Sequence, residues 1–297
     1  MPLTIAALAL ALVVLPETER IATARFDVAG AATLAAAATA FLLAVNRGPV
    51  LGWTSPLVLG AFLATPALAW AFVRVERRAV APLLPLDYLR RRNFSIPILT
   101  QVFTNFAYMG GFIITPLLLQ SVFGYGEAKT GSLLIARPLA FAVAGPVMGY
   151  LAARTGERFA AVGGAAAVFA SMLGLASLDG GSADLHVAGY LALSGVGLGM
   201  SAPALVAAIA NAVDDDDLGV VGATQQMMTQ FGVVVGIQVM QSTQAARASS
   251  VGELGAFGEA YLVGAAAAFL GLVLAFFVRS SVERSKEPAR SRRPVPA

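Results

Sequence analysis

The sequence contains no cysteine, and His186 is its only histidine. Disulfide bonds, thiolate metal sites and sites built from several histidines are therefore excluded. The His-Glu-x-x-His pattern of zinc proteases and the Gly-x-Ser-x-Gly pattern of serine hydrolases are absent too. The sequence thus predicts no enzymatic activity, no metal site and no cofactor.

Charged residues are also scarce. They make up 12% of the chain, and hydrophobic residues make up 58%, whereas an ordinary soluble domain carries about 25% charged residues. Long, nearly uncharged runs follow one another, which is typical of membrane-spanning helices, while spanning strands would alternate over short segments. The sequence therefore predicts an all-α membrane protein whose first partner is the lipid bilayer. The net charge of +3 is modest and gives no indication of nucleic-acid binding.

Eight full spans are expected. They lie near residues 28–45, 57–75, 96–123, 131–153, 159–178, 187–213, 220–241 and 260–278. The apolar run at 3–15 is too short to cross a bilayer, which takes about 20 residues. It also lacks the basic start and the small-residue cleavage site of a signal peptide. We interpret it as the end of a helix whose beginning is missing.

The distribution of Lys and Arg predicts the orientation of these spans. Sixteen basic residues fall in the connections and the tail on one side, and only Arg47, Lys129 and Arg247 fall on the other. The positive-inside rule therefore places the C-terminus in the cytoplasm and the protein in the cell inner (plasma) membrane. The remaining basic residue, Arg137, lies within a span.

Three segments differ from the spans. Residues 79–94 mix apolar side chains with Arg90-Arg91-Arg92 and two prolines, so we expect a connector along the cytoplasmic interface. The tail 280–297 is basic and Pro-rich, which favours disorder. The acidic run 214–217 could bind a divalent cation, but it has no turning glycine, and we favour a solvated connector.

Several motifs, in their order along the chain, carry a resemblance to a known family. They are Leu15-Pro16-Glu17-Thr18 at the end of the first helix, Leu51-Gly52-Trp53-Thr54-Ser55-Pro56 between two spans, and Pro82-Leu83-Leu84-Pro85-Leu86 with Arg92-Asn93-Phe94 in the connector. Together they resemble the fourteen-helix drug:proton antiporters of the major facilitator superfamily.

The resemblance implies a map of the chain. Residues 1–26 would be the end of a truncated helix with its connector, 27–78 two extra linker helices, 79–94 the interfacial connector, 95–279 the complete six-helix C-terminal half, and 280–297 the tail. It also implies a small amphipathic substrate and a proton gradient. The other wall of the transport site would come from a missing N-terminal half or from a second copy of the chain.

Two further motifs fit the family's pattern. Gly149, Arg154, Gly156 and Arg158 resemble its cytoplasmic loop motif, although Ala153 stands where the family has Asp. The resemblance implies a conformational latch weakened by that change, and a simple positive-inside turn is the alternative. Gly195 and Gly199, followed by Pro203, resemble the Gly-rich start of the family's twelfth helix, and glycines one turn apart favour close helix packing.

The residues that could carry transport are few. No acidic residue lies in the central part of any span, although proton coupling needs a titratable group facing a cavity. Arg137 either lines a wet cavity or bonds to backbone carbonyls and snorkels. Two polar stripes either line that cavity or hold helices together; they consist of Gln101, Asn105 and Tyr108 and of Gln226 and Gln230.

The leading hypothesis is a transporter fragment that exports small amphipathic drugs or metabolites, coupled to protons when complete. The alternative is a truncated remnant or membrane interaction module that does not transport. The family's coupling acids are expected in the missing N-terminal half.

Overall fold

The computed structural model describes residue 10 and residues 27–79, 86–213 and 217–279. This part of the chain is helical and contains no strand, which confirms the predicted fold class. Its helices are α2 (Val28–Leu51), α3 (Pro56–Glu76), α4 (Leu86–Arg90), α5 (Arg92–Ser121), α6 (Glu127–Leu134), α7 (Ala136–Thr155), α8 (Glu157–Ala176), α9 (Asp184–Ala210) and α10 (Leu218–Ala275). The predictions for the remaining N-terminal residues and for the tail fall outside the described residues.

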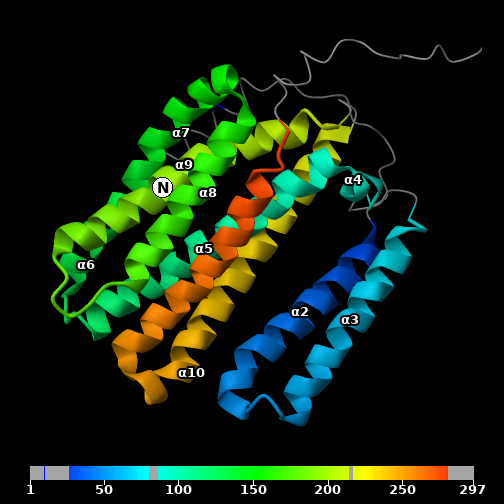
Figure 1. The fold of residues 1–297 in the computed structure, drawn as a ribbon. Coiled ribbons are helices and arrows are strands. Elements are labelled where there is room, and N and C mark those ends of the chain that lie inside the picture. Colours follow the sequence, from blue (N-terminus) through cyan, green and yellow to red (C-terminus); the bar gives the residue numbers. More distant parts are fainter. Residues whose placement is uncertain (1–9, 11–26, 80–85, 214–216, 280–297) are drawn as a thin grey trace, which may run out of the picture.

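The predicted spans appear as helices long and apolar enough to cross a membrane. Seven such helices occur in the described part, where eight spans were expected. The count differs because the last two expected spans follow each other without a loop within residues 218–275 and are separated only by a kink at Gly252 (φ 77°, ψ 165°). Figure 1 shows the two arms of α10 folded back against each other at this point.

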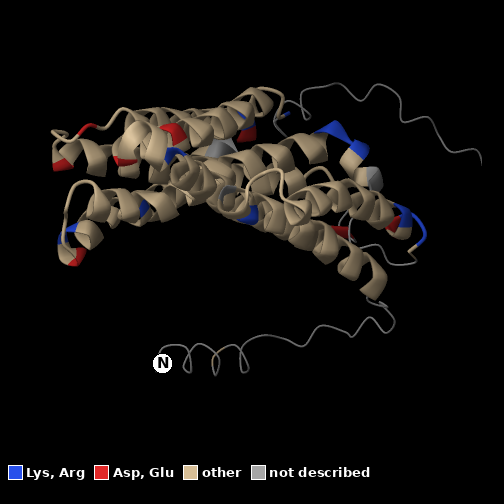
Figure 2. Ribbon diagram, turned by 90° about the horizontal axis from the view of Figure 1, so that it is seen from below, with Lys and Arg blue, Asp and Glu red and all other residues tan. Residues whose placement is uncertain are grey.

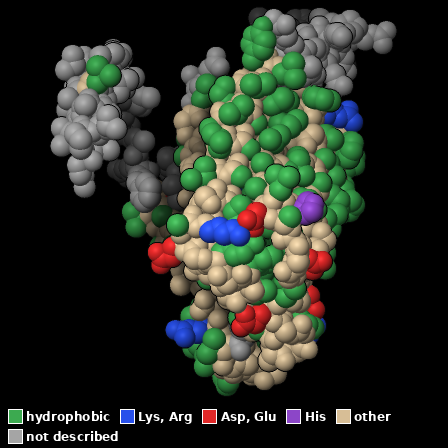
Figure 3. Space-filling view, turned by 90° about the vertical axis from the view of Figure 1, so that its left-hand side faces the viewer, with side chains coloured by type: hydrophobic (Ala, Val, Ile, Leu, Met, Phe, Trp, Pro, Cys, Tyr) green, Lys and Arg blue, Asp and Glu red, His purple; other side chains and the backbone are tan. Residues whose placement is uncertain are grey.

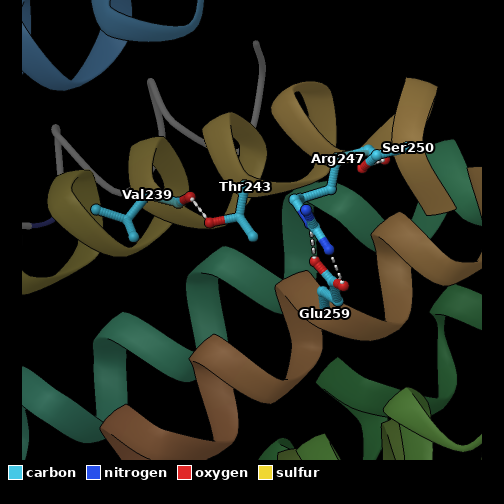
Figure 4. A network of polar contacts seen from close by, with 5 residues as sticks. All are labelled: Val239, Thr243, Arg247, Ser250 and Glu259. Atoms are coloured by element: carbon cyan, nitrogen blue, oxygen red, sulfur yellow. Dashed lines mark hydrogen bonds and ion pairs between the residues drawn. The ribbon is translucent and has the colours of Figure 1, made fainter. Parts of the chain in front are cut away.

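The turn at Gly252 corrects the expected boundaries of the last two spans. Residues 242–251 were predicted to form a loop, but they continue the helix. The backbone of Gly252 lies in a region that only glycine occupies readily. Arg247 on one side of the turn makes a bidentate ion pair with Glu259 on the other, with Nη2 and Oε1 2.8 Å apart (Figure 4).

The predicted span 131–153 is interrupted. α6 ends at Leu134, Ile135 forms a turn, and α7 begins at Ala136. The cause is Pro138, which lacks an N–H and whose ring clashes with the carbonyl four residues earlier, at Leu134. The break places Arg137 in the first turn of α7. α5 also starts at Arg92, earlier than expected, directly after the short helix α4.

Two groups of helices stand side by side in Figure 1. In the bundle, which comprises α5 to α10, α5 packs along α10, and α9 packs between α7 and α8. The second group is the α2–α3 hairpin, which contacts the bundle through α10. Most charged residues gather toward the two ends of the helices (Figure 2), as expected for a bundle embedded in a bilayer.

Close contacts between backbones hold the bundle together. The α7–α9 contact is an example, because a Cβ on Gly195 would lie 2.1 Å from the carbonyl oxygen of Arg137. Helices in lipid associate mainly through such close packing, since lipid tails are as apolar as the side chains. The outer side of α7 is strongly apolar, and Figure 3 shows hydrophobic side chains over much of that face of the molecule.

Candidate functional site

Arg137 is the most deeply buried charge among the described residues. Its side chain is 1% exposed and is the largest of the fully buried side chains there. It enters the bundle from the start of α7 and meets α5. Its guanidinium lies over the rings of Tyr108 and Phe112, whose centroids are 5.0 and 5.7 Å from Cζ. On the other side, Gly195 of α9 packs directly against the backbone carbonyl of Arg137.

The hydrogen bonds of Arg137 are incomplete. Nη1 donates to the backbone carbonyl of Tyr108 at 3.2 Å. Nε and Nη2 are buried and have no hydrogen-bond partner within the described residues. A guanidinium carries five N–H donors, and a charge at the centre of a bilayer costs about 2.5–3.5 kcal/mol even where water and lipid adapt. Two nitrogens of the guanidinium, Nε and Nη2, are therefore left without a hydrogen-bond acceptor in the described part.

A polar face of α5 leads from Arg137 along the helix. Gln101, Asn105 and Tyr108 recur on this face and are all buried, with exposures of 8%, 6% and 6%. Asn105 Nδ2 donates to the carbonyl of Gln101 at 2.9 Å. Gln101 Oε1 accepts a hydrogen bond from Gln225 of α10 at 3.0 Å. The structure therefore brings the α5 stripe together with Arg137 and with α10.

The second predicted stripe lies elsewhere. Gln226 and Gln230 are exposed and turn away from the contacts between the described helices, so the proposal that they line a cavity stays a prediction. Gln225 occupies the inward position instead. Sequence reasoning missed Gln225 because α10 is apolar on most sides, so the pattern did not fix the rotation of the helix.

A second buried polar pair was also missed. Thr115 of α5 and Tyr261 of α10 have hydroxyl oxygens 2.8 Å apart, and both side chains are fully buried. Thr115 Oγ1 also reaches the carbonyl of Gly111 at 2.5 Å. A lone Thr and a lone Tyr in apolar runs give no sequence signal, because the spacing of neither shows that they meet. This pair extends the polar face of α5 beyond Arg137.

The loop motif forms the turn between α7 and α8. Gly156 has φ 89° there, Arg158 is exposed, and Gly149 has open space beside it. The side chain of Arg154 lies outside the described residues. Glu157, to which the sequence analysis assigned no role, is 6% exposed and accepts a hydrogen bond from Asn211 of α9 at 3.2 Å.

The glycines of α9 lie against α7. Besides the contact of Gly195 with Arg137, a Cβ on Gly199 would lie 2.9 Å from Cβ of Ala144. Pro203 lies within α9 without ending it. Within the described residues, no group of three or more His, Asp and Glu side chains could hold a metal ion. Three residues of the acidic run, 214–216, lie outside that part.

Comparisons with known proteins place this arrangement in a family. Residues 3–237 match the model of the Major Facilitator Superfamily. The chain belongs to that superfamily. The match covers most of the spans and confirms the family predicted from the connector motifs.

The named relatives that the chain matches are transport and resistance proteins. The chain is 24% identical to the multidrug transporter protein MdtP of Bacillus subtilis over 76% of this chain and 42% of that protein. It is 29% identical to the multidrug resistance protein Stp of Mycobacterium tuberculosis (75% and 41%) and 30% identical to the tetracenomycin C resistance and export protein of Streptomyces glaucescens (84% and 47%). The chain thus spans less than half the length of each of these relatives.

Proposed function

We propose that this chain is the C-terminal part of a transporter in the cell inner membrane that exports small amphipathic drugs or metabolites. Membership of the superfamily carries the proposal, and the names of the relatives support drugs as the substrate class. The C-terminus is cytoplasmic in this proposal. Seven helices of membrane length in the described part fit a multi-pass protein.

Arg137 is the residue on which we place substrate recognition. Its buried Nε and Nη2 atoms lack partners within the described residues, and such a group is retained at a cost in stability. An anionic or strongly polar group of the substrate would complete its hydrogen bonds. A carboxylate from the N-terminal half, or from a second copy of the chain, could do so in the state without substrate. Gln101, Asn105 and Tyr108 would line the path beside it.

Proton coupling, in this proposal, resides outside this chain. The buried carboxylates of the described part include Glu76 at the end of α3 and Glu157 at the start of α8. Both lie at helix ends rather than near the middle of the bilayer, where a coupling group would sense both sides in turn. The coupling acids are therefore assigned to the N-terminal half, which would also supply the second wall of the site.

Efflux from cells tests the proposal. The chain would be expressed alone and together with the N-terminal half of a related drug exporter, and export of a fluorescent amphipathic compound with an anionic group would be followed with and without a protonophore. We expect proton-dependent efflux only on co-expression. Efflux from the lone chain would contradict the assignment of the coupling acids, and none in any combination would favour the remnant.

Substitution of Arg137 tests the site. Arg137→Met keeps the volume of the side chain but removes the charge, so we expect at least tenfold slower export with an unchanged or higher melting temperature, because the unpaired buried charge is gone. Arg137→Lys should retain part of the activity. Arg47→Met, which removes an exposed charge from α2, is the matched control. Normal export by both Arg137 variants would leave this residue a structural role only.

A further inference from the structure

A basic cavity opens at one end of the bundle, away from Arg137. It has a volume of about 320 Å³ and is lined by Arg91, Arg92, Asn93, Ala212 and Arg279, which we call the arginine pocket. Arg91 precedes α5 and Arg92 begins it, Ala212 follows α9, and Arg279 follows α10. Three segments that are far apart in the sequence thus bring three guanidinium groups to one cavity.

The charge of the arginine pocket is not balanced within the described residues. The two ion pairs between described residues are Lys129–Asp184 and Arg247–Glu259, so none of the three pocket arginines pairs with a carboxylate of the described part. Asp217 lies near this end of the bundle, but its carboxylate accepts a hydrogen bond from the hydroxyl of Tyr88. Three like charges around one cavity repel each other, and an anion in the cavity relieves that repulsion.

Aromatic rings hold two of these guanidinium groups in place. Arg91 lies over the ring of Tyr88, with Cζ 4.4 Å from the centroid, and Arg92 lies over Phe277 at 5.2 Å. Stacking occupies the flat face of a guanidinium and leaves its N–H edge free for two parallel hydrogen bonds to phosphate oxygens. The start of the 30-residue helix α5 adds backbone N–H groups and the positive end of the helix dipole.

The surroundings of the arginine pocket favour a lipid over a soluble anion. Phe276 and Phe277, at the end of α10, are 51% and 47% exposed, which is costly in water but favourable against acyl chains. The pocket lies at the start of α5 and just beyond the ends of α9 and α10, and charged residues gather toward the helix ends (Figure 2). Its volume of about 320 Å³ equals roughly ten water molecules, at about 30 Å³ each, which leaves room for a phosphodiester headgroup.

We propose that the arginine pocket binds the phosphate of an anionic phospholipid headgroup, with Phe276 and Phe277 against its acyl chains. Bound lipid would tie the start of α5 to the ends of α9 and α10. The site is separate from Arg137, so it can be tested without any transport activity.

The test is lipid binding by the purified full chain in nanodiscs of phosphatidylcholine. Fluorescent phosphatidylglycerol would be titrated against the parent chain, R91Q/R92Q and R77Q/R78Q. The last variant removes the same charge from two exposed arginines just after α3. Two guanidinium groups that donate directly to the phosphate are lost in R91Q/R92Q, so we expect binding to weaken at least tenfold. We expect R77Q/R78Q to stay within about twofold of the parent. Equal weakening in both variants would show a general charge effect and overturn the proposal, as would no weakening in either.

Two further measurements guard against misfolding of R91Q/R92Q and against binding of a soluble anion. R279Q changes a residue beyond the end of α10 and leaves every helix intact, so weaker binding by this variant supports the site even if R91Q/R92Q folds poorly. Inorganic phosphate at millimolar concentration is the second arm. If it displaces phosphatidylglycerol fully, and Phe277→Ala leaves lipid binding unchanged, the pocket is a site for soluble anions and the lipid proposal is wrong. We expect weak displacement and a clear loss of binding by Phe277→Ala.

Discussion

Helices α5 and α9 of the bundle and the two helices of the α2–α3 hairpin are about equally apolar, yet they are packed very differently. In their apolar windows, α5 and α9 each bury 56% of the residues, whereas α2 and α3 bury 22% and 17%. The hairpin touches the bundle through a small set of contacts on α10, including Asn46 Nδ2 to Gln238 Oε1 at 3.0 Å and a tilted ring pair, Phe41 and Phe231. Hydropathy alone therefore does not distinguish a helix of the packed core from one that mostly faces lipid.

The difference in burial shows which helices are held in place by contacts with other helices and which mainly face lipid. The bundle fixes its helices through backbone contacts and buried polar groups, such as Thr115 with Tyr261. On the hairpin, Leu63 and Trp70 are 73% and 64% exposed, and lipid is the solvent for such side chains. The hairpin is thus attached to the bundle through few contacts, and its identity as the family's extra pair of helices stays a prediction.

The first prediction has an all-or-none outcome and tests whether the two groups share one orientation. Thr54, at the turn of the hairpin, and Gly180, between α8 and α9, are exposed and were placed on the external side by the basic residues. In this cysteine-free chain, T54C and G180C should both react with an impermeant thiol reagent added to intact cells, and R78C should react only after lysis. Labelling of R78C from outside would reverse the orientation. Labelling of G180C but not T54C would separate the hairpin from the bundle.

The second prediction compares one glycine from each group. A Cβ on Gly195 would lie 2.1 Å from the carbonyl oxygen of Arg137, whereas a Cβ on Gly60 of α3 meets nothing within 4 Å. Gly195→Ala should lower stability by about 1–3 kcal/mol through overpacking. Gly60→Ala should be neutral or stabilise by up to about 1 kcal/mol, because alanine favours helix. Thermal melting of the purified chain measures both. Equal shifts for the two variants would mean that α7 and α9 can separate at little cost.

The helices themselves were predictable because long uncharged runs allow only helices in a bilayer. The residues at which the helices begin and end were harder to predict. Residues 242–251 looked like a loop because Gln, Ser and Arg replace apolar residues, yet Ala, Gln and Arg are good helix formers, and the helix ends only at Gly252. The break before Arg137 follows from Pro138, which the sequence analysis did not use to place a helix boundary.

The candidate site was predictable in part. Arg137 stands out because it is the one charge within a span. Which partners it meets was not predictable, since these depend on how α5, α7 and α9 are rotated against one another. Gln225 and Gln226 are adjacent and chemically identical, but only Gln225 bonds to Gln101. The arginine pocket was missed because its residues come from three connections whose proximity only the fold determines.

The third prediction tests how tightly the hairpin is attached. F41C/F231C places two thiols where the rings have centroids 6.5 Å apart, and a short bifunctional thiol reagent should cross-link them. Adding Asn46→Ala removes the hydrogen bond to Gln238. A hydrogen bond between membrane helices contributes about 0.6 kcal/mol, so cross-linking should slow by about threefold.

Its matched control is Thr65→Ala, which removes a hydroxyl that bonds only within α3, to the carbonyl of Ala61 at 2.9 Å. This variant should cross-link at the rate of F41C/F231C alone. A threefold slowing by Thr65→Ala as well would show that any polar truncation loosens the hairpin, and no slowing by Asn46→Ala would show that the ring contact suffices.

The smallest effect is expected at the turn of α10, which is stabilised by two features: the backbone conformation of Gly252 and an ion pair across the turn. Gly252 provides a backbone conformation that other residues adopt only with strain, and the ion pair between Arg247 and Glu259 crosses the turn beside it. The two side chains are 45% and 36% exposed, so water and salt screen their attraction. Glu259→Gln should therefore lower the melting temperature only slightly, and the difference from the parent should vanish at high salt. Gly252→Ala should cost about 1–3 kcal/mol at any salt concentration, because backbone strain is not screened. If Glu259→Gln destabilises the chain as much as Gly252→Ala does, and still does so at high salt, the ion pair rather than the glycine determines this turn.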